Sequence, residues 1–233
     1  MIEKKLKTTT GKLLVKIPTQ LNELRLEQLM AMQASENLND LQAIHILSGI
    51  PLDQLQNISN YNELQLFNTH VLSLANQIQQ LYNSDQLPKT VTLYTDRQPV
   101  KVKVTSNLSV EPAGAFMAAR DIISDEIGKH IAQHGEDDWK DSFNPSLKAC
   151  SQVLAHYFYC PATRKPYNEY EAEAFTSQVE QLPVTDALPI AKYFFLSYPN
   201  LSKPKTGFWH RLLHRWNSGQ VFRRLRSSGI STR

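Results

Sequence analysis

The chain contains no acidic residue after Asp186, although nine Lys and Arg residues follow it. The whole sequence of 233 residues has a formal net charge of +3, so residues 1–186 carry −6 and residues 187–233 carry +9. Such asymmetry usually marks the surface that meets an anionic or acidic partner. We therefore expect a single helical domain over residues 1–200 and a basic amphipathic C-terminal arm over residues 201–233.

The overall composition limits the class of protein. A hydrophobic fraction of 41% and a charged fraction of 20% are typical of a soluble globular protein. No window approaches the roughly 18 apolar residues that a membrane helix needs, so no integral membrane association is expected. The first residues lack the apolar run of a secretory signal. Cys150 and Cys160 are too few to staple a chain of this size, which favours reduced thiols in a cytosol.

Most of the chain reads as helix. Asn39 is a candidate N-cap and Gly49 a candidate C-terminal stop for a helix over residues 40–48. Asn168 with Glu171 forms a second capping pattern, and Thr185 is expected to cap a last, very apolar helix in which Pro189 falls within the first turn. The predicted helices are Leu26–Ala34, Asp40–Ser48, a short segment from Pro51 to Ile58, Asn62–Tyr82, Pro112–His134, Pro145–Tyr159 and the two after Asn168 and Thr185.

The longest of the early helices has a regular apolar seam. Its apolar residues keep a 3-4-3-4-3 spacing, which is typical of a helix that packs lengthwise against another helix. The seam spans less than three heptads, so it fits either an internal core face or a surface that binds a partner. Its residues are Leu64, Phe67, Val71, Leu74, Ile78 and Leu81.

The hydrophobic period changes from helical to two between residues 90 and 105. Val91 and Leu93 alternate with polar residues, as do Val100, Val102 and Val104, and the segment Thr95–Pro99 between them resembles a turn. This pattern predicts a β-hairpin with a five-residue loop. A lone hairpin is marginal, so we expect the strand at residues 12–17 to complete a three-stranded sheet. The predicted fold class is α+β, mainly α-helical, with a small three-stranded antiparallel sheet.

The C-terminal arm is predicted to be two basic amphipathic pieces separated at Asn217-Ser218-Gly219. Four uses of it compete: covering the body's own core, docking on a protein partner, binding nucleic acid, or lying on a membrane surface. Its expected partner-binding apolar face is Phe208, Trp209, Leu212, Leu213 and Trp216. The residues expected to contact an anion or nucleic acid are Lys203, Lys205, Arg211, Arg215, Arg223, Arg224 and Arg226.

No sequence pattern identifies a reaction. Two histidine pairs stand four residues apart, His130 with His134 and His210 with His214, but neither has the glutamate or third ligand of a zinc site. Cys150, His156 and Cys160 do not form a zinc knuckle, and the acidic residues 136–141 lack the spacing of a calcium loop. Phosphate-binding glycine loops and nucleophile elbows are also missing. We expect no catalytic residues, no metal and no cofactor, and hence a protein that is not an enzyme.

Three short segments of the N-terminal third follow one another in a distinctive order. They are Val15-Lys16-Ile17-Pro18-Thr19, then Leu24-Arg25-Leu26-Glu27-Gln28-Leu29, then Ile46-Leu47-Ser48-Gly49-Ile50-Pro51 followed by Leu52, Leu55 and Ile58. The order is a strand, a proline, a short helix led by Leu-Glu-Gln, and a second helix ending in Ser/Thr-Gly-Ile-Pro. This order resembles that of phage tail assembly chaperones, and the resemblance covers about residues 12–82.

The resemblance implies a non-enzymatic phage protein that binds another tail or virion protein during assembly, with the tape measure protein as a candidate partner. It implies a location in the host bacterial cytoplasm, with retention in the virion as a further option. The alternative function is a phage nucleic-acid-binding protein that acts through the basic arm.

Overall fold

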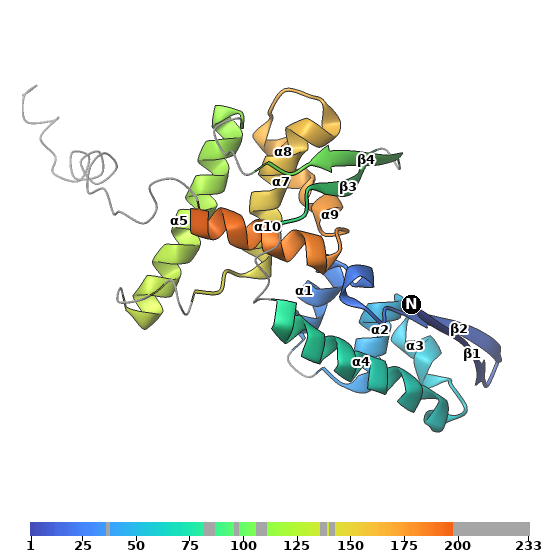
Figure 1. Ribbon diagram of the computed structural model, residues 1–233. Coiled ribbons are helices and arrows are strands. Elements are labelled where there is room, and N and C mark those ends of the chain that lie inside the picture. Colours follow the sequence, from blue (N-terminus) through green and yellow to red (C-terminus); the bar gives the residue numbers. More distant parts are fainter. Residues whose placement is uncertain are drawn as a thin grey trace, which may run out of the picture. The chain divides into compact units, whose positions relative to one another are not determined.

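The computed structural model describes residues 1–35, 38–81, 87–95, 98–105, 111–135, 139 and 143–197. The chain divides after Ser197, and residues 1–197 form one compact unit. The arm expected over residues 201–233 lies outside the described residues, so the predicted domain division stays a prediction. The described part is mainly helical with small antiparallel sheets, as expected (Figure 1).

The predicted three-stranded sheet is wrong, because the described strands form two separate two-stranded sheets. Strand β2 (Gly11–Ile17) pairs antiparallel with β1 (Ile2–Thr8), from Ile2 opposite Ile17 to Thr8 opposite Gly11. Residues 8–11 contain the turn of this hairpin. Gly11 adopts a φ of 149°, a conformation that residues with a side chain rarely adopt. The first strand therefore satisfies the hydrogen bonds that we expected the central hairpin to supply.

The central hairpin forms as predicted, with β3 (Thr90–Thr95) antiparallel to β4 (Gln98–Lys103). Its loop is shorter than the expected five residues, because the ladder continues until Thr95 lies opposite Gln98. Val91, Leu93 and Val102 are buried on the inner face. This face packs against the later helices α7 and α9.

The N-terminal helices follow the predicted bounds closely. A 3-10 turn, η1 (Leu21–Glu23), leads to α1 (Leu26–Ala34) and α2 (Asp40–Ser48). The Asn39 side chain accepts the Gln42 backbone N–H at 2.9 Å, and Gly49 ends α2 in the left-handed region with φ 71°. Both caps are those that the sequence indicated. Helix α3 (Leu52–Gln56) then follows Pro51.

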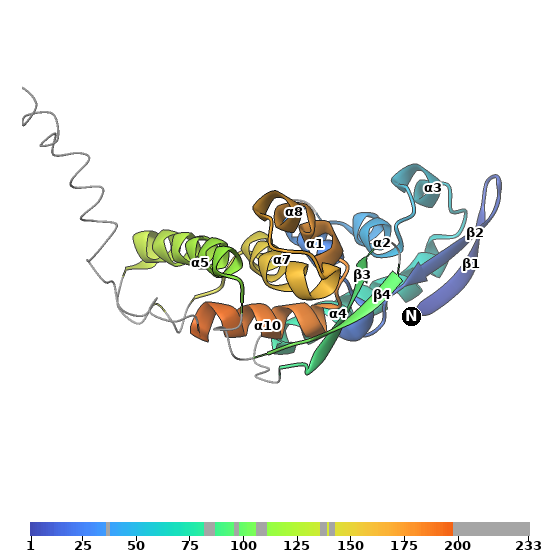
Figure 2. The ribbon, with the colours of Figure 1, turned by 90° about the horizontal axis from the view of Figure 1, so that it is seen from above.

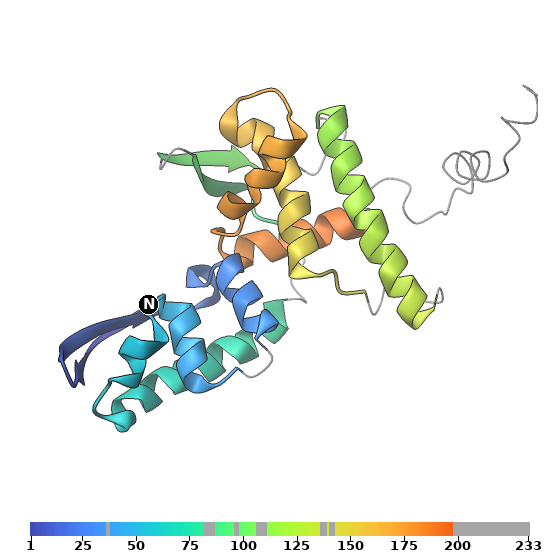
Figure 3. The same cartoon turned by 180° about the vertical axis from the view of Figure 1, so that it is seen from behind.

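Helix α4 (Tyr61–Leu81) carries the apolar seam and packs against α2 and η1. Figure 3 shows this helix beside the other N-terminal helices. Leu64, Phe67 and Leu74 are buried, whereas Val71 and Ile78 are half-buried. The seam is thus mainly a core face, which is one of the two uses that its spacing allowed.

The C-terminal half packs around one apolar helix, α7 (Leu147–Thr163), which contacts α5 (Ala113–His134) and α10 (Val184–Ser197) (Figure 2). Two short helices, α8 (Glu169–Ala174) and α9 (Thr176–Val179), lie between α7 and α10 in the sequence. Asn168 caps α8 by accepting the Glu171 N–H at 3.1 Å, as predicted. None of the described helices is both long and apolar enough to cross a membrane.

The start of the last helix differs from the prediction. Helix α10 begins at Val184, so Thr185 lies inside it and Pro189 is its sixth residue rather than part of the first turn. The earlier start has a physical reason. The Val184 N–H has no acceptor within the helix, but it donates to the Leu24 carbonyl at 2.9 Å.

Candidate functional site

All twelve residues predicted to bind a partner or an anion lie in the arm, outside the described residues. Lys203, Lys205, Phe208, Trp209, Arg211, Leu212, Leu213, Arg215, Trp216, Arg223, Arg224 and Arg226 therefore remain predictions. The structure instead draws attention to α1 and the surface on either side of it.

The first turn of α1 is held by a segment more than 150 positions later in the sequence. The Leu26 N–H donates to the Leu182 carbonyl and the Glu27 N–H to the Glu180 carbonyl, each at 2.9 Å. The first N–H groups of a helix lack intrahelical acceptors, so these two bonds satisfy donors that would otherwise need water or a capping side chain. They fix α1 against the segment between α9 and α10.

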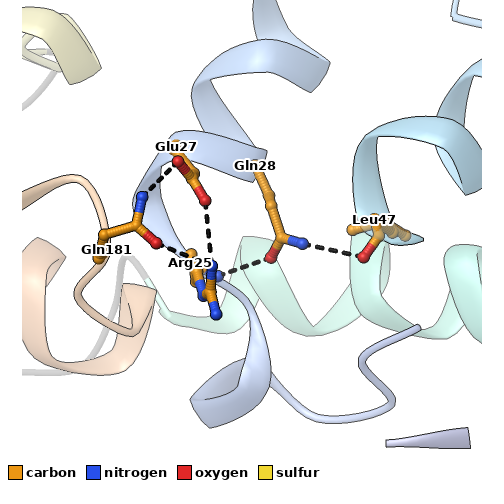
Figure 4. A network of polar contacts seen from close by, with 5 residues as sticks. All are labelled: Arg25, Glu27, Gln28, Leu47 and Gln181. Atoms are coloured by element: carbon orange, nitrogen blue, oxygen red, sulfur yellow. Dashed lines mark hydrogen bonds and ion pairs between the residues drawn. The ribbon is translucent and has the colours of Figure 1, made fainter. Parts of the chain in front are cut away.

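A network of side chains extends this connection at the surface (Figure 4). Arg25 Nη1 donates to Gln181 Oε1 at 2.7 Å and lies 3.3 Å from Glu27 Oε1, while Gln181 Nε2 donates to the second oxygen of Glu27. Gln28 accepts the Arg25 backbone N–H and donates through Nε2 to the Leu47 carbonyl at 2.9 Å. The Arg25 and Glu27 side chains remain 56% and 40% exposed, so both can contact a partner.

One groove of about 650 Å³ lies on the α2 side of α1, and we call it the α2-side groove. The end of β2, the segment leading into α1, and the last turn of α2 line it. His45 holds this last turn in place, because its Nδ1–H donates to the Ile50 carbonyl at 2.6 Å. The lining residues are Met1, Lys16, Pro18, Glu23, Arg25, Glu27, Gln28, Ala31, His45, Ile46, Leu47, Ser48 and Gly49.

A second groove of about 530 Å³ lies on the other side of α1, and we call it the α7-side groove. It is bounded by α1, the start of α7 and Glu180. The two grooves share Glu27 and Ala31, so the exposed face of α1 forms a ridge between them. The α7-side lining is Glu27, Met30, Ala31, Gln33, Ala34, Ser146, Leu147, Lys148 and Glu180.

The α7-side groove carries charges of both signs. Glu27, Glu180 and Lys148 all line it, and Arg25 Nη1 lies 3.3 Å from Glu27. Burial raises the pKa of Glu180 above its usual value of 4.5, the nearby charge of Glu27 raises it further, and a hydrogen bond with Ser151 lowers it. The two carboxylates repel each other, and Lys148 offsets part of their charge.

The buried ionisable groups of α7 have no evident nucleophilic arrangement. Burial raises the pKa of Cys150 to about 12, so its thiol remains protonated at neutral pH. Burial also lowers the pKa of His156, whose Nδ1 lies 2.9 Å from the Tyr167 hydroxyl. Both side chains are buried on α7, each with 3% of its surface exposed.

The histidine and cysteine pairs weighed as metal ligands can be placed in part. The His130 and His134 rings stack at 4.5 Å, and His134 Nδ1 lies 3.1 Å from the His130 carbonyl. Across the described residues there is no group of three or more His, Cys, Asp or Glu side chains able to hold a metal ion. Residues 136–138, 141, 210 and 214 lie outside that part of the chain.

Sequence reasoning did not identify the surface around α1. Its α2 side is built largely from the three N-terminal segments quoted above, to which no site had been assigned. Its other side depends on residues 180–184, whose backbone contacts leave no local signal in the sequence. No known protein family, curated protein or solved structure matches this chain.

Proposed function

We propose that the chain is a non-enzymatic, tail assembly chaperone-like phage protein, which binds another tail or virion protein through the surface around α1. The tape measure protein is the candidate partner, and the binding takes place in the host bacterial cytoplasm during assembly. The apolar face of the arm supplies a second contact in this proposal.

The observation that carries the proposal is the convergence of three sequence segments on one groove. Nine of the thirteen residues that line the α2-side groove belong to the segments that resemble tail assembly chaperones. They come from the end of β2, from the start of α1 and from the last turn of α2. These nine are Lys16, Pro18, Arg25, Glu27, Gln28, Ile46, Leu47, Ser48 and Gly49.

The chemistry of the surface supports a peptide segment as the ligand. The last turn of α2 presents the negative end of its helix dipole to the α2-side groove. On the other side of α1, Glu27 and Glu180 stand together with Lys148, and Ala31 and Ala34 leave room for a backbone to approach. A partner helix or extended segment with small residues and one or more Lys or Arg residues fits these features.

The test adds a bulky side chain to the ridge between the two grooves. Ala31→Arg places a long charged side chain on an exposed position shared by both, and Ala174→Arg makes the same change at an exposed alanine that ends α8. Each full-length variant is co-expressed with the tape measure protein and, separately, with other tail proteins of the same phage. Co-purified complex is then quantified, and thermal unfolding reports on the fold.

Ala31→Arg should reduce the recovered complex at least tenfold, whereas Ala174→Arg should leave it unchanged, and both should unfold at the wild-type temperature. Equal recovery with the two variants would show that the α1 surface is not the binding site. Absence of a complex between the wild-type protein and any tail or virion protein would refute the proposed function itself. The Trp209→Ala, Trp216→Ala double variant measures the contribution of the arm in the same assay.

A further inference from the structure

The β1–β2 hairpin concentrates positive charge in a body that is otherwise acidic. Residues 2–17 contain five Lys and one Glu, whereas residues 18–197 contain 12 Lys and Arg against 21 Asp and Glu. The hairpin therefore has a formal charge of +4, and the rest of the compact unit −9. The sequence prediction of an anionic partner had considered only the C-terminal arm.

The strand register gathers most of this charge on one face. Alternation places Leu6, Val15 and Ile17 on the inner face, where all three are fully buried. The opposite face carries Lys5, Lys7, Lys12 and Lys16, all exposed, together with Glu3 and Leu14, which is 46% exposed. Within the described part of the chain, these four lysines make no ion pair or side-chain hydrogen bond. We call this surface the lysine face.

The turn end of the lysine face is the most strongly charged. Lys7 lies directly opposite Lys12, and like charges in such a pair destabilise a hairpin. Lys5 lies one repeat along the same strand, about 6.8 Å from Lys7. Three ammonium groups thus occupy a small area and form no ion pair, although Glu3 lies one repeat from Lys5 on the same face. This is a local conflict of the kind that functional surfaces retain.

The side chains on this face favour nucleic acid over protein as the partner. Protein interfaces are depleted in Lys and enriched in aromatic residues and Arg, whereas the lysine face has four Lys, no aromatic residue and no Arg. A duplex presents closely spaced phosphates, and each Lys contact releases condensed counterions. The face has no Asn, Gln or Arg, and Lys acts as a flexible point charge rather than as the planar fork of Arg, so we assign its contacts to the phosphate backbone.

We propose that the lysine face of the β1–β2 hairpin binds the phosphate backbone of nucleic acid without sequence specificity. This proposal does not rest on the proposed protein-binding function, although the two surfaces meet at Lys16. Lys16 also lines the α2-side groove, so the test leaves it unchanged.

The test compares two triple variants of the full chain that lose the same charge. Lys5→Gln, Lys7→Gln, Lys12→Gln neutralises the turn end of the lysine face. Lys89→Gln, Lys101→Gln, Lys103→Gln neutralises three exposed lysines in and beside the β3–β4 hairpin. Affinity for a short labelled duplex of arbitrary sequence is measured by fluorescence anisotropy between about 50 and 200 mM salt. Thermal unfolding and sedimentation confirm that both variants are folded and monodisperse.

The slope of log K against log salt should fall by about 2 to 3 for the β1–β2 variant, since each lost phosphate contact removes about 0.9. The β3–β4 variant should change the slope by less than about 1. Equal changes in both variants would show that only net charge matters, and no change in the first would show that the lysine face does not touch the duplex. Either result would overturn the proposal, as would wild-type protein that does not bind the duplex.

Two further outcomes would assign the face another role. If the β1–β2 variant loses binding to anionic vesicles or to poly-glutamate but keeps the wild-type DNA slope, the partner is not nucleic acid. If the variant only aggregates more readily, the lysines protect the strand edges from pairing, which is a common use of Lys in exposed strands. The proposal would be rejected in both cases.

Discussion

The two hairpins share one local pattern and differ in what surrounds them. Each is antiparallel, alternates buried and exposed residues, and buries three apolar side chains on its inner face. The β1–β2 hairpin packs against α2 and is joined to the segment after α3 through the Ser59 N–H, which donates to the Lys7 carbonyl at 2.9 Å. The β3–β4 hairpin packs against α7 and α9 instead.

This difference shows that the alternation of apolar and polar residues predicts a strand but not the strand with which it pairs. The sequence of residues 11–17 alone would allow this strand to pair either with β1 or with the β3–β4 hairpin, because its inner face could be buried in both cases. The short connection at residues 8–11 decides the matter, because a nearby strand closes a smaller loop and loses less entropy than one about 75 residues away. Local closure therefore produced two small sheets rather than one larger sheet.

The prediction with the largest expected effect on stability tests whether both hairpins belong to one cooperative unit. Leu6→Ala and Leu93→Ala each remove a side chain that is at most 1% exposed, so each should lower the free energy of unfolding by about 2–5 kcal/mol. Urea unfolding followed by circular dichroism should show one transition for both variants. Two separate transitions in either variant would mean that the hairpins belong to independently unfolding regions.

A smaller effect should be strongest in the β3–β4 hairpin. The Tyr157 hydroxyl accepts the Thr105 backbone N–H at 2.9 Å and donates to the Thr105 carbonyl at 3.1 Å. Tyr157→Phe removes both bonds and should cost about 1–3 kcal/mol. Amide hydrogen exchange should accelerate more at Thr105 and along β4, which open locally, than along β1 and β2. Equal acceleration in both hairpins would mean that β4 opens only when the whole unit unfolds.

The smallest expected effect is a gain in the free energy of unfolding rather than a loss. Lys12→Thr relieves the repulsion between Lys7 and Lys12 and should stabilise the protein by about 0.2–1 kcal/mol at low salt. Lys101 lies opposite the uncharged Thr92, so Lys101→Thr should stabilise less. The gain from Lys12→Thr should also shrink in high salt, because exposed charges are screened. Matching gains from the two variants would indicate that the pairing of Lys7 with Lys12 carries no energetic cost.

Local signals in the sequence predicted much of the helical architecture. The bounds of α2 and the caps at Asn39, Gly49 and Asn168 were found because each depends on residues within one turn of the helix end. Strand β1 was missed because Lys4 occupies an inward-facing position between Ile2 and Leu6, which hides the alternation. The start of α10 was misplaced because its first N–H bonds to Leu24, which no pattern near residue 184 reveals.

The candidate site was predictable only in part. The segments around Glu27 and Ser48 were noticed through a family resemblance, but their convergence on one groove requires the fold. The α7-side groove depends on the backbone contacts of residues 180–184. Backbone hydrogen bonds between segments more than 150 positions apart leave no mark on side-chain identity, so sequence reasoning could not find them.

The attachment of α1 to residues 180–184 also constrains when the protein can finish folding. During synthesis, the Leu26 and Glu27 N–H groups leave the ribosome long before their acceptors at Leu182 and Glu180 exist. At about 5–20 residues per second, the interval is roughly 8–30 s. Throughout that interval the surface around α1 is incomplete. A nascent chain therefore gains its complete binding surface only after residue 182 has left the ribosome.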